Sequence, residues 1–138
     1  MKRNEAREEV MKALYEIEIS GNAPEFTLAN LKEQVDDDAS FAYIRSMITG
    51  ILDRTETLNE RIGRYSKEWG EWDRLAIIDR IILRLSTYEI LYREDIPNVV
   101  SVNEAVNMAK KYSTEASGSF VNGILARILK ETQNQEEA

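Results

Sequence analysis

Two arginines near the start of the chain, Arg3 and Arg7, are four residues apart and so fall on one side of a helix. Two guanidinium groups at that spacing could bind two phosphates or stack on exposed bases. The glutamates of the same segment fall on the other flank, so a solvated stripe of paired charges is the commoner use of this spacing. Spacing alone therefore leaves phosphate binding as a hypothesis.

A second candidate surface lies near the end of the chain, where one arc of a predicted helix carries only small side chains. This smooth strip consists of Ala116, Ser119, Gly123 and Ala126, opposite an apolar arc. A glycine inside a helix costs about 1 kcal/mol relative to alanine, so a smooth outward strip calls for an explanation. Either the helix is buried on both sides, which is the commoner arrangement, or another chain lies flat along it.

Catalytic chemistry is narrowly limited, because the chain contains no cysteine and no histidine. Disulfides, thiolate zinc sites, cysteine nucleophiles and histidine-dependent triads are therefore excluded. Carboxylates, serines and lysines remain, but any helical chain of this size contains them. We therefore expect a binding module without enzymatic activity, metal or cofactor. Glu89, beside Tyr88 at the edge of an apolar face, is expected to have a structural role.

The composition describes a folded, acidic protein of 138 residues, with 43% apolar residues, 31% charged residues and a net charge of −7. Such a charge excludes a generic polyanion binder, because nonspecific phosphate affinity depends on cations that displace counterions. Residues 75–130 carry almost no net charge, with 7 Lys+Arg and 6 Asp+Glu. No apolar run is long enough for a membrane span or a signal peptide, so we expect a cytoplasmic protein.

The elements that position these residues are all predicted to be helices, since apolar residues recur with helical period and no segment alternates as a strand does. A first helix over residues 4–20 ends at Gly21. A short second helix covers residues 27–35, and a third of about 26 residues begins after Asp38.

The second half is predicted to start with a hinge over residues 65–72, which contain Trp69 and Trp72. Asp73 can cap a long helix that reaches Arg93. Ser101 and Glu104 have the spacing of a capping box for a fifth helix, and Thr114 can cap a last helix that ends near Thr132. The chain is thus one domain of two helical lobes, residues 1–66 and 73–132, with a frayed acidic tail over 133–138.

Four segments, in order, resemble the NusB family of transcription antitermination factors. They are Ala6-Arg7 with Ala13-Leu14-Tyr15; the run from Asp79 to Glu89 followed by Ile96-Pro97; Val102 to Val106 with Ala109-Lys110-Lys111; and Phe120 to Leu125. The resemblance covers nearly the whole chain. It implies an all-α fold of two packed three-helix bundles, and binding of single-stranded boxA RNA from ribosomal operons. It also implies a heterodimer with NusE, a small-subunit ribosomal protein, within an RNA polymerase antitermination complex, and some relatives form homodimers.

The resemblance also implies which residues bind. The family's arginine-rich start matches only Lys2, Arg3 and Arg7, and its Phe-Val-Asn-Gly motif matches without a gap. Many members have an aspartate after the following leucine, where this chain has Ala126. The expected RNA-binding residues are Lys2, Arg3, Arg7, Ala116, Ser119, Phe120, Asn122 and Gly123. The expected NusE-binding residues are Tyr15, Glu18 and Asp79.

Three other functions are compatible with the residues. A helical protein-interaction module without an RNA role suits an acidic surface and a smooth helix face equally well. A detached RNA-binding domain of the ribosomal RNA cytosine methyltransferase type would have the same fold, although this chain has no cysteine nucleophile and no Rossmann segment. A hydrolase based on carboxylates is the third alternative.

Overall fold

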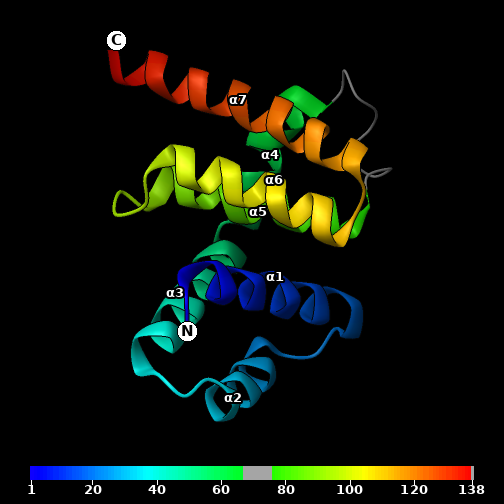
Figure 1. Cartoon of the computed structure of the whole chain (residues 1–138), viewed down its shortest axis with the longest axis vertical. Coiled ribbons are helices and arrows are strands. Elements are labelled where there is room, and N and C mark those ends of the chain that lie inside the picture. The colour runs from blue at the N-terminus through cyan, green and yellow to red at the C-terminus, as the bar shows by residue number, and fades with distance from the viewer. Residues whose placement is uncertain (67–75, 138) are drawn as a thin grey trace. The chain divides into compact units, whose positions relative to one another are not determined.

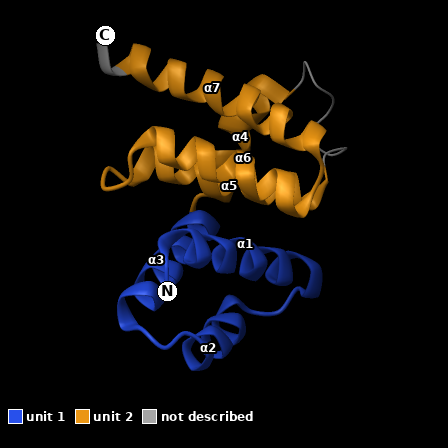
Figure 2. Ribbon diagram, in the orientation of Figure 1, with its two compact units in different colours: residues 1–53 blue, residues 54–138 orange. Residues whose placement is uncertain are grey.

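Seven helices and no strand make up the part of the chain that the structure, a computed structural model, describes, which is residues 1–66 and 76–137 (Figure 1). The predicted all-α fold is confirmed. The chain divides into two compact units, residues 1–53 and 54–138 (Figure 2). No helix within the described ranges has the length and apolarity that crossing a bilayer requires.

The first unit contains three helices: α1 (Arg3–Ser20), α2 (Pro24–Gln34) and α3 (Asp38–Asp53). Helices α1 and α3 pack on each other, and their apolar stripes are buried. Gly21 ends α1 in the left-handed conformation, with φ of 71°, and its amide donates to the carbonyl of Ile17. This is the stop that the sequence predicts, because glycine adopts positive φ without steric cost.

The second unit contains four helices among its described residues: α4 (Thr55–Ser66), α5 (Ile77–Tyr92), α6 (Asn98–Tyr112) and α7 (Glu115–Glu137). Its core is aliphatic, and α7 packs on α4, α5 and α6. The amide of Ser117 donates to the Thr114 hydroxyl at 3.0 Å, so Thr114 caps α7 as predicted.

The predicted third helix of about 26 residues is wrong, because the chain forms α3 and α4 with a break at Arg54. Thr55 and Thr57 lower the helix propensity there. The Arg54 guanidinium lies over the ring of Tyr92, at 4.5 Å from its centroid, so this segment packs with the second unit. Consequently α4 belongs to the second unit, and the units divide at residue 53 rather than at the predicted hinge.

Three other predicted boundaries are also wrong. Helix α2 starts at Pro24, whose fixed φ suits the first helical position. Helix α6 starts at Asn98 rather than at the predicted capping box, because the Pro97 carbonyl accepts the first helical hydrogen bond. Ser101 is therefore buried inside the helix. Helix α7 ends at Glu137 rather than near Thr132. Trp69, Trp72 and Asp73 lie outside the described residues.

Candidate nucleic-acid interface

The N-terminal basic segment presents two cations, Lys2 and Arg3, both of which are exposed. The guanidinium carbon of Arg3 lies 4.0 Å from the centroid of the Tyr43 ring, which is itself buried. This cation–π contact restricts the arginine side chain while leaving the residue exposed. Arg3 is therefore positioned for an anionic ligand at low entropic cost.

Arg7, in contrast, is only 1% exposed. Because Arg7 is buried, Arg3 and Arg7 cannot bind two phosphates side by side as hypothesised. The alternative, a solvent-exposed row of paired charges, is excluded for Arg7 for the same reason. The spacing of Arg7, three residues before Val10 and seven before Leu14, is that of the buried stripe of α1, but its charge favoured a surface position because arginines are seldom fully buried. A buried arginine requires compensating partners, so Arg7 serves the fold in this conformation.

An ion pair with Asp37 holds Met1, the residue before Lys2, in place. The N-terminal amine donates to Oδ2 of Asp37 at 2.8 Å, and the amide of Ser40 donates to Oδ1 at 2.7 Å. The hydrogen bond from the amine, followed by those from Ser40, lowers the pKa of Asp37 to about 2. The same carboxylate raises the pKa of the N-terminal amine. The start of the chain is thus anchored beside α3.

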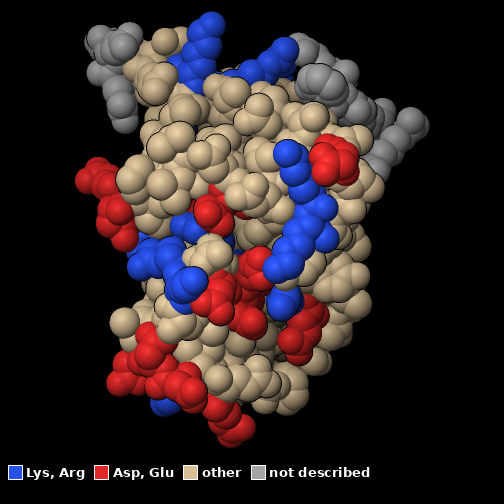
Figure 3. Space-filling model, in the orientation of Figure 1, with Lys and Arg blue, Asp and Glu red and all other residues tan. Residues whose placement is uncertain are grey.

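The smooth strip is exposed along α7, since Ala116, Ser119 and Ala126 are exposed and Gly123 is half-buried. The opposite face of the helix is buried, so burial of the helix on both sides, the commoner arrangement, is wrong here. Where α7 lies in the second unit, Figure 3 shows Lys and Arg on an otherwise largely uncharged surface. Another chain can therefore lie flat on this side of α7.

Two other predicted RNA-binding residues extend the strip on either flank. Asn122 is exposed, and Phe120 is half-buried at the edge of the core face. The structure thus brings together five of the predicted RNA-binding residues on one helix, and these are Ala116, Ser119, Phe120, Asn122 and Gly123.

The predicted partner-binding residues separate into two groups. Tyr15 is 39% exposed and Glu18 is exposed on α1, next to Ile19, which is 56% exposed. The sequence analysis missed Ile19, although its position four residues after Tyr15 and outside the buried stripe of α1 was a usable signal. Tyr15 and Ile19 form an apolar pair on the surface of the first unit.

Asp79 does not lie on a surface, because it is only 6% exposed. Its Oδ2 atom accepts a hydrogen bond from the Ser117 hydroxyl at 2.9 Å, and the hydroxyls of Ser113 and Thr114 lie within 3.0 Å of the same Ser117 oxygen. The single Ser117 proton goes to Asp79, so the two other hydroxyls donate to Ser117. This network ties the first turn of α5 to the start of α7 and is inconsistent with direct partner contact by Asp79.

The sequence analysis also missed a polar cluster where α4 packs on α7. Glu131 accepts hydrogen bonds from Tyr65 and Arg64, and from the Nε atom of Arg61 at 3.3 Å. The hydrogen bond from Tyr65, and secondarily the charges of Arg61 and Arg64, lower the pKa of Glu131 against an opposing effect of burial. Within the described ranges no group of acidic side chains is arranged to hold a metal ion.

Comparison with known proteins identifies the family. A family model described as the NusB family matches residues 4–130. A transcription antitermination protein NusB from Clostridium novyi is 44% identical over 135 residues, which cover 94% of this chain and 99% of that protein. The chain belongs to the NusB family. The resemblance drawn from four sequence segments is thereby confirmed.

Solved structures of NusB have the same fold as this family member. A structure of NusB from T. maritima matches with a TM-score of 0.85 and 40% identity, covering 95% of this chain and 92% of that one. A chain from a crystal structure of antitermination factors NusB and NusE in complex with dsRNA matches with a TM-score of 0.81 and 24% identity, covering 95% and 99%. The NusB-like fold predicted from the sequence is confirmed, while the residue-level binding roles in this NusB-family chain stay predictions.

Proposed function

We propose that this NusB-family chain is a transcription antitermination factor that binds boxA-type single-stranded RNA of ribosomal operons together with NusE, and so promotes readthrough by RNA polymerase. The observation that carries this proposal is the match, over 94% of the chain, to a protein named for antitermination. The role requires binding rather than catalysis, and it places the protein in the cytoplasm with the transcription machinery.

The smooth strip of α7 is the proposed RNA contact in the second unit. Single-stranded RNA is recognised through splayed bases that stack and hydrogen-bond, which a flat helix face permits. Asn122 and Ser119 offer exposed amide and hydroxyl groups to base edges. Lys2 and Arg3 provide a separate phosphate contact in the first unit.

The proposed contact with NusE is the apolar pair of Tyr15 and Ile19, together with Glu18. Exposed apolar side chains on an acidic chain suit a protein partner, because aromatic residues supply much of the affinity at interfaces. A ribosomal protein with basic character would add the phosphate attraction that a chain with a net charge of −7 lacks.

The proposal is tested by titrating the protein with a boxA strand, a scrambled strand and a duplex of the boxA sequence, each with and without NusE and over a range of salt concentrations. We expect preference for the boxA single strand, and tighter binding when NusE is present. Equal binding to all three nucleic acids under every condition would contradict the RNA role. Binding of NusE without any RNA preference would instead support a protein-interaction module.

The role of the strip is tested by replacing Gly123 with glutamine. A glycine in a helix costs about 1 kcal/mol relative to good helix formers, so Gly123→Gln should preserve or raise the melting temperature. A long side chain on the flat face should lower RNA affinity about tenfold, which corresponds to about 1.4 kcal/mol. Gly63→Gln in α4 is the matched control, because a Cβ there meets no atom within 4 Å. If both variants bind RNA like the parent, the strip is not the RNA contact.

A further inference from the structure

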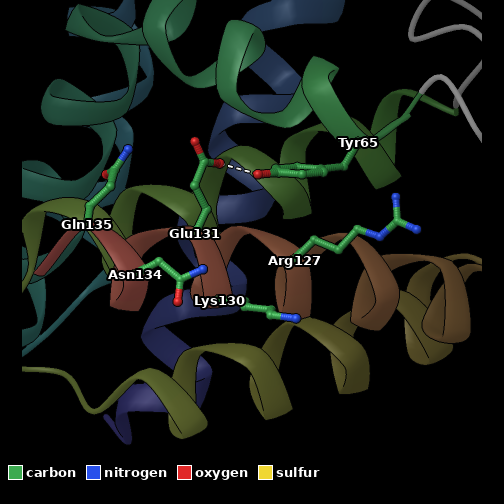
Figure 4. A pocket seen from close by; sticks show the side chains of 6 residues that line it. All are labelled: Tyr65, Arg127, Lys130, Glu131, Asn134 and Gln135. Atoms are coloured by element: carbon green, nitrogen blue, oxygen red, sulfur yellow. Dashed lines mark hydrogen bonds between the residues drawn. The ribbon is translucent and has the colours of Figure 1, made fainter. Parts of the chain in front are cut away.

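A cavity of about 520 Å³ lies in the second unit beside the C-terminal half of α7 (Figure 4). It is lined by Tyr65 of α4 and by five residues of α7, which are Arg127, Lys130, Glu131, Asn134 and Gln135. Its volume falls in the range typical of sites for small ligands, about 300 to 1,000 Å³. The cavity can therefore accommodate a base or a nucleotide.

The one carboxylate in the cavity wall is already occupied by donors of the protein. Glu131 accepts from Tyr65, Arg64 and Arg61, and Arg61 also donates to Gln135 at 3.2 Å. These contacts hold Glu131 in its anionic form, as its lowered pKa indicates, and they fix the hydroxyl end of the Tyr65 ring. The ring is half-buried and thus forms a rigid wall of the cavity.

Among the side chains that the structure describes around this cavity, the carboxylates are paired with arginines and one lysine has no ion pair. Arg64 pairs with Glu60 as well as Glu131, and Arg61 pairs with Glu131, so the two carboxylates are matched by two arginines. Lys130 is exposed and forms no ion pair with any side chain that the structure describes. Arg127 is exposed on the previous turn, and Figure 4 shows both cationic side chains extending toward the same side. An anionic ligand is therefore favoured over a cationic one.

The cavity continues the smooth strip along one face of α7. Gly123, Arg127, Lys130 and Asn134 follow at spacings of four, three and four residues, which keeps them on the same side of a helix. From Ala116 to Asn134 this face extends about 27 Å at 1.5 Å per residue. A chain that lies on the strip thus reaches the cavity without leaving the helix.

We propose that single-stranded RNA bound on the smooth strip continues along α7 into this cavity, where one further nucleotide is held. Lys130 and Arg127 bind its phosphate, its base stacks on Tyr65, and the Asn134 amide contacts the base edge. A single strand fits this arrangement better than a duplex, because only an unpaired base exposes the face that Tyr65 would cover. The inference rests on the proposed RNA-binding function and extends its surface.

The test uses the full chain with NusE and two kinds of RNA: a minimal boxA strand, and the same strand lengthened by six nucleotides at either end. We expect one lengthened strand to bind the parent protein about tenfold more tightly than the minimal strand, as stacking of one base predicts. Lys130→Ala and Tyr65→Leu should each remove this gain without changing affinity for the minimal strand. Lys130→Ala should also make the salt slope of the lengthened strand shallower by about 0.7, the contribution of one phosphate in a single strand.

Lys32→Ala in α2 is the charge-matched control, since Lys32 is exposed on the first unit. If neither lengthened strand binds the parent more tightly than the minimal strand, the inference is overturned while the RNA role stands. If the minimal strand is not preferred over its scrambled version, the proposed function itself fails and the inference fails with it. If Lys130→Ala weakens NusE binding and leaves every RNA affinity unchanged, the cavity contacts protein and the inference is wrong.

Discussion

Replacement of Asp79 tests whether this carboxylate serves the fold or a partner. The structure predicts that it serves the fold, because Asp79 is 6% exposed and accepts the Ser117 hydroxyl at 2.9 Å. The informative variants are Asp79→Ala, Ser117→Ala and the double variant. Both residues lie in first turns, of α5 and α7, so truncating them disturbs no helix interior.

The expected loss in the free energy of unfolding follows from the chemistry of the hydrogen bond between Ser117 and Asp79. A hydrogen bond to a charged group contributes about 1.5 to 3 kcal/mol. Ser117→Ala should lie near the upper value, because it leaves a buried carboxylate whose Oδ1 atom already has no partner among the described residues. Asp79→Ala should cost less, about 1.5 kcal/mol, since it removes the charge as well. The loss of stability in the double variant should be about 1.5 kcal/mol smaller than the sum of the losses in the two single variants, and this difference is the coupling energy of the two residues.

Thermal and urea unfolding measure these losses, and titration with NusE measures partner binding. At about 3 °C per kcal/mol for a chain of this size, Ser117→Ala should lower the melting temperature by about 9 °C. NusE affinity of the folded variants should equal that of the parent, whereas Ile19→Ser on the exposed face of α1 should reduce it. Asp95→Ala is the control for loss of a carboxylate, because Asp95 is 57% exposed. Unchanged stability with weakened NusE binding in Asp79→Ala would refute the structural role.

Two further outcomes concern the first unit. The pKa of Asp37 is lowered and that of the N-terminal amine is raised. The stability that their ion pair supplies should therefore be lost as pH falls from about 4 through about 2, and also as pH rises above about 8. Asp37→Asn should remove both of these pH dependences of the free energy of unfolding, whereas Asp36→Asn should leave them unchanged. Arg7→Gln should cost about 3 kcal/mol in urea unfolding, as expected when a buried charged group is removed from its partners, and an intact fold with weakened RNA binding would show instead that Arg7 contacts the ligand.

The features that could be predicted from the sequence are those set by nearby residues. The stop at Gly21 and the Thr114 cap depend on contacts within about four residues, and both are present in the structure. The arrangement of the smooth strip opposite an apolar arc likewise depends only on helical period. Its exposure was not predictable, since periodicity cannot tell whether a second layer covers the outer face.

The features that the sequence analysis missed depend on tertiary contacts. Arg7 was assigned to the surface because of its charge and is buried, and Asp79 was assigned to a partner surface and is tied to a serine 38 residues later. The capping box at Ser101 failed because Pro97 starts the helix one turn earlier. The cavity beside Tyr65 requires α4 and α7 to pack together, and no local pattern encodes that pairing.

The charge distribution determines how such a chain can select RNA. The cations assigned to RNA contact are few, namely Lys2, Arg3, Arg127 and Lys130, whereas the face between the last two and Ala116 is uncharged. Four phosphate contacts correspond to a salt slope of about −2.8 for a single strand, which is too shallow to supply tight nonspecific binding. In the proposed complex, affinity then comes from bases laid on the strip, and contacts with base edges are specific for sequence in a way that phosphate contacts are not. An acidic protein that cannot hold arbitrary RNA by charge is then selective by default, and a basic partner can add strength to the complex without removing that selectivity.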